Sequence, residues 1–286
     1  MDPTVELLIR SAFFAVVFAA LALWEIGAPR RALVAGRAPR WPHNLGILLV
    51  DVLAVRILVP TAAVGAALFA AGRGWGLLHL AGLRLSVAAL LGFLVLDLVI
   101  YAQHVVFHKV PLLWRLHRMH HADLDFDVST GGRFHPFEIL ISMLIKIATV
   151  IAFGIPVVAV LLFELALNAT SLFNHANVAM PPALDRILRL LVVTPDMHRV
   201  HHSVLRRETD SNFGFNLPWW DRLFGTYRPQ PELGHSGMTI GLPIFRDSRE
   251  LRIDRLLTQP FRDDRAEAGD QDQKPADFQR PHTSKS

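Results

Sequence analysis

Histidines dominate the residues of this chain that could do chemistry. They fall in three groups at helical spacing: His104-x-x-x-His108, His117-x-x-His120-His121 and His198-x-x-His201-His202. Side chains three or four residues apart on a helix project from one face, about 5–6 Å apart at Cβ, so each group can present several imidazoles to one ion. With His175, nine imidazoles are candidate metal ligands. One metal takes about four to six ligands, so nine predict two metals, and imidazole suits zinc, copper, iron and nickel alike.

A second set of polar residues lies at spacings that could support these ligands. The series Asp97, Tyr101, His104, His108 and the series Glu164, Asn168, Ser171, His175 both recur at intervals of 4, 3 and 4 residues. Carboxylates within a membrane need partners. We therefore expect these two seams either to join helices or to face each other and hydrogen-bond the ligands. His135, which a proline follows, is a tenth candidate, either as a ligand or as a support.

The composition indicates a membrane protein. Of 286 residues, 52% are apolar and 19% are charged, and the mean hydropathy is +0.34. Soluble chains carry about 25% charged residues, so one or two soluble domains are the weaker reading. There is no cysteine, which excludes disulfides, zinc–thiolate sites, iron–sulfur clusters and thiol catalysis. The excess of basic residues flanks apolar segments, which indicates orientation in a bilayer, and no nucleic-acid partner is expected.

Long apolar runs predict an all-α integral membrane protein with four to five membrane helices. The runs cover residues 5–26, 45–71, 83–106 and 137–173, and about 20 apolar residues span the hydrocarbon core. The last run is too long for one span, and because Gly154-Ile-Pro156 interrupts it, we expect a tight helical hairpin there. A signal peptide is the alternative for the first run. Its leader should be basic, but the first six residues contain two acids and no base, so we expect the run to be retained.

The charges flanking the runs predict how the helices are oriented. Four arginines and no acid lie between the first two runs, at positions 30, 31, 37 and 40. This places that loop in the cytoplasm and the N-terminus outside. Counting forward, all the candidate ligands then lie on the cytoplasmic face. We expect residues 1–80 to be N-terminal membrane helices, 81–260 a catalytic domain with a helical cytoplasmic cap, and 261–286 a disordered polar tail.

The three histidine groups, in this order, together with Asn212–Tyr227, resemble the fatty acid hydroxylase/sterol desaturase superfamily of membrane-bound non-haem di-iron enzymes. The resemblance covers about residues 85–230. It implies that the eight histidines of the three groups, and His175, bind two iron ions. It further implies that O₂ attacks an unactivated C–H bond of a fatty acyl, sterol-like or isoprenoid lipid, by hydroxylation or desaturation. Some relatives carry another histidine just after this position; here Val178 and Ala179 stand instead, and Asn177 could hold a water.

Electrons for such chemistry are expected from a separate protein, a reductase or a ferredoxin-like or cytochrome b5-like carrier. The chain has neither a dinucleotide-binding glycine fingerprint nor a Cys-x-x-Cys-His haem motif. An acidic carrier could dock on the basic residues of the cap, and anionic lipid headgroups are an equal alternative for them. These residues are Arg186, Arg189, Arg199, Arg206 and Arg207.

Two other functions use histidine within membranes. A metal transporter would carry its ligands near mid-membrane, whereas these histidines lie at or beyond one end of the predicted spans. A zinc-dependent membrane hydrolase usually has about three protein ligands and a carboxylate base, as in His-Glu-x-x-His, which the sequence lacks. Both alternatives are therefore less well supported than an oxygenase.

Overall fold

The computed structural model describes residues 3–262, and this part of the chain is all-helical. Eight helices precede the cap: α1 (Pro3–Gly27), α2 (Trp41–Leu58), α3 (Ala62–Arg73), α4 (Leu77–Leu80), α5 (Leu85–Lys109), α6 (Pro111–His121), α7 (Pro136–Phe153) and α8 (Val157–His175). Shorter ones follow: α9 (Pro182–Leu188), α10 (Pro195–His201), α11 (Arg206–Thr209), α12 (Trp219–Leu223), α13 (Gly234–Gly237) and α14 (Ile253–Thr258). The 3₁₀ turns are η1 (Val128–Gly132), η2 (Ser248–Leu251) and η3 (Gln259–Phe261).

Five segments of the described chain are long and apolar enough to cross a membrane, at the upper end of the predicted four to five. They are Val5–Gly27, Trp41–Leu80, Leu85–Lys109, Pro136–Phe153 and Val157–His175. The second differs from expectation, because the single run predicted over 45–71 is broken between α2 and α3. Pro60 lies in the break. Because proline has no N–H to continue the helix, α2 ends before it and a new helix, α3, starts at Ala62.

The fourth and fifth segments divide where the sequence predicts. α7 ends at Gly154, whose φ of 63° is left-handed, and α8 begins after Pro156. Gly76, in the turn before α4, packs directly on this break: a Cβ there would lie 2.0 Å from the Gly154 nitrogen. The two turns therefore close the end of the bundle away from the histidines.

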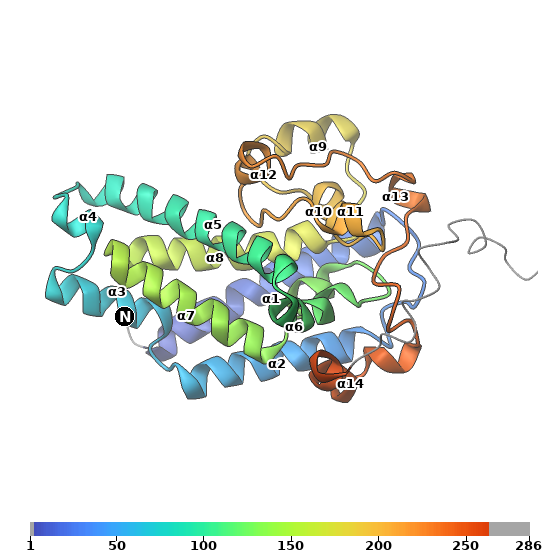
Figure 1. The fold of residues 1–286 in the computed structure, drawn as a ribbon, viewed down its shortest axis with the longest axis horizontal. Coiled ribbons are helices and arrows are strands. Elements are labelled where there is room, and N and C mark those ends of the chain that lie inside the picture. Colours follow the sequence, from blue (N-terminus) through green and yellow to red (C-terminus); the bar gives the residue numbers. More distant parts are fainter. Residues whose placement is uncertain (1–2, 263–286) are drawn as a thin grey trace, which may run out of the picture.

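The membrane helices pack around a core of small and apolar side chains. Ala63, Ala66 and Ala67 of α3 lie fully or almost fully buried in one cluster with Leu96 of α5 and Phe163 of α8. Small residues let helices approach closely where lipid offers no hydrophobic driving force between them. The result is a bundle whose long axis runs horizontally in Figure 1, with α9 and α12 beside it and α13 beyond the ends of α5 and α8.

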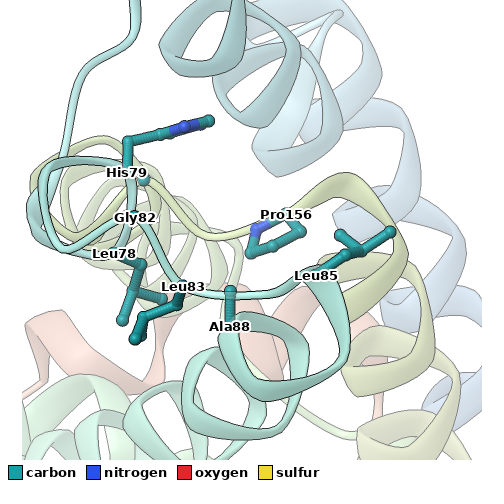
Figure 2. A pocket seen from close by; sticks show the side chains of 8 residues that line it. Leu78, His79, Gly82, Leu83, Leu85, Ala88 and Pro156 are labelled. Atoms are coloured by element: carbon teal, nitrogen blue, oxygen red, sulfur yellow. The ribbon is translucent and has the colours of Figure 1, made fainter.

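A hollow lined mainly by apolar side chains lies at the other end of the bundle. Leu78, His79, Gly82, Leu85 and Pro156 are among the residues that line a cavity of about 320 Å³ (Figure 2). It lies beside the Gly76–Gly154 contact, at the opposite end of α5 from His104 and His108. The cavity is therefore separate from the nine candidate metal ligands, although another histidine, His79, lines it. The tail predicted over 261–286 falls, from residue 263 onward, outside the described residues.

Candidate metal centre

Four helices bring the nine predicted histidines together. The last turns of α5 carry His104 and His108, and Pro111 then starts α6 at once, which carries His117, His120 and His121. α8 ends on His175, while α10 and the residue after it supply His198, His201 and His202. All nine are at most 3% exposed. The corner between α5 and α6 and the ends of α8 and α10 thus enclose one buried site.

The histidines form two groups rather than one. His104, His108, His117, His121 and His201 make one group, and His120, His175, His198 and His202 make the other; within each, the ligand atoms lie within 4.8 Å of one another. Both copies of the His-x-x-His-His pattern are divided between the groups in the same way. Its outer residues, four apart, share a group, and its middle residue points into the other group. Each copy of the pattern therefore serves both sites.

The rings are oriented by oxygen acceptors behind them. The Nδ1 atoms of His104, His175 and His201 each lie 2.7 Å from a backbone carbonyl, those of Phe213, Ser171 and Ser211 respectively. His117 Nδ1 lies 2.7 Å from Glu138 Oε1, His120 Nδ1 3.1 Å from the Arg133 carbonyl, and His108 Nδ1 3.3 Å from Asp210 Oδ1. Carbonyl and carboxylate oxygens can only accept, so these Nδ1 atoms donate and the Nε2 atoms keep their lone pairs.

The Nε2 atoms of different histidines face one another, and neither atom of such a pair carries a hydrogen to donate. His104 Nε2 lies 3.0 Å from Nε2 of both His117 and His201, and His175 Nε2 lies 3.0 Å from His120 Nε2. His108 Nε2 and both nitrogens of His198 are buried without a hydrogen-bond partner. Facing lone pairs repel one another unless a cation lies between them. The donor sets therefore fit two metal ions, one in each group.

Burial keeps the histidines in the form that binds metal. Outside the membrane helices, loss of hydration and then the neighbouring imidazoles hold the pKa well below the usual histidine value. This applies to His120, His121, His198, His201 and His202. Neutral imidazole is the ligand form. The site is therefore prepared for metal at neutral pH.

Sequence reasoning missed the two carboxylates that contact ligands. Glu138, in the first turn of α7, hydrogen-bonds His117, and Asp210, after α11, hydrogen-bonds His108. Glu138 had a local signal, since it follows the proline that starts α7 and so falls in the helix's first turn. Asp210 had none, because it meets His108 across 102 residues of chain.

The predicted supporting residues take other positions. His135 caps α7, with Nδ1 accepting from the Phe137 N–H and Nε2 3.2 Å from the Leu257 carbonyl, and belongs to neither group. The Asn177 side-chain amide donates to the Arg31 carbonyl, 2.8 Å away. Asn168 lies exposed on α8. None of these three side chains contacts a histidine of the two groups through a described hydrogen bond.

The two polar seams do not face each other. Asp97 accepts from Asn216 and Trp220 and the Tyr101 hydroxyl meets Thr226, so this seam holds the segment after the last histidine group. Glu164 instead pairs with Lys146 of α7 and Arg10 of α1, which joins three membrane helices. α5 packs against α8 through apolar side chains such as Phe93 and Phe163, while Asp97 and Tyr101 contact the segment that follows the last histidine group.

A buried ion network supports the loop behind the second group. Arg40 binds both oxygens of Asp123, at 2.6 and 2.7 Å, and also contacts Asp127 and Thr130. Burial alone would raise the pKa of Asp123, but Arg40 and Arg133 hold it well below the usual value. The Arg133 carbonyl in turn accepts from His120. An arginine of the first loop, predicted only to orient the chain, thus also positions a ligand.

Comparisons with known proteins agree with this geometry. Residues 89–226, which contain all nine histidines, match the sequence model of the family described as fatty acid hydroxylase. The chain is 31% identical over 157 residues to the ornithine lipid hydroxylase OlsE of Rhizobium tropici, which is 54% of this chain and 46% of that protein.

Two further relatives match the same part of the chain. Alkylglycerol monooxygenase of Homo sapiens is 30% identical over 158 residues, 54% of this chain and 33% of that protein. Very-long-chain aldehyde decarbonylase GL1-1 of Oryza sativa subsp. japonica is 32% identical over 155 residues, 51% of this chain and 24% of that protein. The chain thus matches less than half the length of each of these relatives. No solved structure matches the chain.

Proposed function

Because residues 89–226 make this chain a member of the fatty acid hydroxylase family, we propose that it is an O₂-dependent di-iron enzyme that hydroxylates or desaturates an unactivated C–H bond of a membrane lipid. The observation that carries the proposal is the division of nine buried imidazoles into groups of five and four with converging Nε2 atoms. When bound, two iron ions supply the O₂ activation that no side chain can supply. The catalytic unit is residues 81–260, supported by residues 1–80.

Phe215 marks the side from which a lipid would approach. Its ring lies 5.1 Å from that of His104, in the first group, and 5.9 Å from that of His198, in the second. The side chain also packs against the apolar core of the membrane helices, and it is only partly buried. An apolar chain entering from the bilayer along Phe215 would meet both groups. The printed names of the relatives, ornithine lipid, alkylglycerol and very-long-chain aldehyde, all refer to lipids.

Electrons would arrive near Trp114. Its ring lies 4.8 Å from His108 and 5.4 Å from His121, and it is partly exposed. The guanidinium of Arg206 lies 4.9 Å from the centre of the indole ring, and Lys109 is exposed nearby on Asp210. These charges favour an acidic carrier of the ferredoxin or cytochrome b5 type. One hydroxylation consumes one O₂, two electrons and two protons, and releases one water.

Part of the predicted docking surface is ruled out. Arg189 and Arg199 are buried, because each pairs with an acid of the cap, Asp185 and Asp196 respectively. They hold the cap together and cannot contact a carrier. Arg186 is exposed on α9, and Arg206 and Arg207 are both more than half exposed, so these three remain. We place this surface on the cytoplasmic face, with the N-terminus outside, following the charges of the first loop.

Isotope incorporation tests the proposal. Cells with and without the gene are grown under isotopically labelled O₂, and their lipids are compared by mass spectrometry. The expected result is a lipid that gains one labelled oxygen, or loses two hydrogens, only when the gene is present. A variant with His201→Ala, which removes a ligand of the first group, serves as control and should abolish the product. No gene-dependent change in any lipid would contradict the proposal.

A further inference from the structure

We propose that α9 and α12, with the residues flanking them, are inserted into the same bilayer that the five spans cross, and that lipid acyl chains cover their exposed face. These helices belong to the part of the chain expected to form a cytoplasmic cap. The inference rests on the depth at which they pack, on their exposed side chains and on their charges. It does not depend on which reaction the histidines perform.

The depth follows from contacts with α5. Trp220 Nε1 and Asn216 Nδ2 each donate to Asp97, both at 2.8 Å. Asp97 has twelve residues of the 25-residue helix α5 on either side. Since roughly 20 residues cross the hydrocarbon core, every such stretch of α5 contains Asp97. The side chains that contact it therefore lie at hydrocarbon depth.

A second contact places the end of α12 at a similar depth. The ring of Phe224 stacks on that of Tyr101, with centroids 5.5 Å apart. Tyr101 lies eight residues before the end of α5, about 12 Å along its axis at 1.5 Å per residue. In Figure 1, α12 accordingly lies alongside α5 and α8, whereas α13 lies beyond their ends.

The outward face of this region is apolar. On α12 and just after it, Trp219, Leu223 and Phe224 are 43%, 68% and 56% exposed. On α9 and just after it, the exposed large apolar side chains are Leu184, Ile187, Leu190 and Leu191. The Trp219 indole donates to the Leu190 carbonyl at 2.7 Å, which joins the two elements into one surface. Exposed apolar surface of this size on a membrane protein needs a cover.

The charges of the surface fit a membrane interface. Within residues 181–192 and 217–225, the acids Asp185 and Asp221 are buried, and the exposed charged side chains are Arg186 and Arg222. Arginine can keep its aliphatic part in the apolar layer while its guanidinium reaches the headgroups. Anionic headgroups also attract it. A second copy of the chain could cover the same face, but the depth on α5 favours lipid.

The absence of cysteine makes the test direct. Single-cysteine variants are made at Leu223 and Ile187 on the proposed surface, labelled with an environment-sensitive fluorophore and reconstituted in phosphatidylcholine vesicles. Leu90→Cys on the exposed side of α5 is the positive control, and Leu233→Cys, just before α13 and equally exposed, is the negative control. Quenching is then measured with phosphatidylcholine that carries a spin label partway down its acyl chain.

Insertion predicts that Leu223→Cys and Ile187→Cys are quenched about as strongly as Leu90→Cys, while Leu233→Cys is not. Leu223→Cys should also resist a membrane-impermeant thiol reagent that modifies Leu233→Cys. Reaction of all three cap positions with that reagent would overturn the proposal. So would protection of Leu223→Cys without lipid quenching but with cross-links between copies. Each readout uses the whole chain and none requires metal or turnover, so failure of the oxygenase proposal would leave the result unchanged.

Discussion

His117 Nδ1 lies 2.7 Å from Glu138 Oε1, and both side chains are almost fully buried. The same ring presents Nε2 to His104 at 3.0 Å and to His121 at 3.2 Å. A carboxylate behind an imidazole fixes the tautomer and strengthens the ligand. Glu138 therefore acts on the first histidine group through His117, without itself belonging to it.

Replacing Glu138 should weaken one metal site selectively. Glu138→Ala removes the acceptor behind His117, and we expect metal affinity of the first group to fall about 10- to 100-fold. Glu138→Gln keeps an oxygen acceptor and should lose less. The affinity is measured by chelator competition on purified protein. Equal affinity in wild type and Glu138→Ala would contradict the role given to this carboxylate.

Arg40→Ala should destabilise the whole protein. It leaves Asp123 and Asp127 buried without their main cation, and breaking a buried pair costs about 3–5 kcal/mol. Arg40→Lys should rescue little, because one ammonium cannot bind both oxygens of Asp123. Thermal unfolding in detergent measures the change, with the exposed Arg249→Ala as matched control, expected to unfold at the same temperature as wild type. Similar midpoints for Arg40→Ala and Arg249→Ala would refute the network.

Stability should fall on mild acidification through His235. Burial lowers the pKa of this histidine to about 4, and Asp196 offsets only part of that effect. The unfolded chain, with a pKa of about 6.5, then binds more protons between pH 6.5 and 4, so folding loses stability as pH falls through that window. At about 1.4 kcal/mol per unit, the loss from His235 reaches about 2 kcal/mol at pH 5. The free energy of unfolding of His235→Gln should fall less between pH 7 and pH 5 than that of wild type. An equal fall in both proteins would contradict this.

Trp114→Leu should slow reduction of the metal centre by a protein carrier. The indole is the partly exposed ring in contact with both His108 and His121. Stopped-flow reduction with ferredoxin should be several-fold slower, while reduction by dithionite changes little. Trp75→Leu, at the far end of the bundle, should behave as wild type. If Trp114→Leu slowed reduction by ferredoxin and by dithionite equally, the substitution would have damaged the metal site, and the role of Trp114 in electron transfer would be contradicted.

Helical spacing predicted that the eight histidines of the three groups could share a site, and His175 was expected there because it ends the helical hairpin. Positions three and four apart share a helix face, and the order of the groups predicts one buried site. The division into five and four was not predictable, because on one helix His117 faces both His120 and His121. Only the direction from which α8 and α10 arrive assigns His120 to the second group.

Hydrogen-bond partners that are distant in the sequence also could not be predicted. The carboxylate of Asp97 was correctly expected to need a partner, but the partner, Trp220, lies 123 residues away. Nothing local distinguishes that choice from a contact with Glu164. Likewise, the apolar run over residues 45–71 predicts one helix. The chain is interrupted at Pro60 between α2 and α3, although both helices still belong to one candidate membrane span.

Metal analysis of protein purified without oxygen tests the central claim most directly. The account predicts about two iron ions per chain, since the nine histidines form two groups. His120→Ala, which removes one ligand of the group of four, should lower the iron content while Leu233→Cys leaves it unchanged. A single zinc ion per chain in protein that converts lipid at full rate would contradict the account.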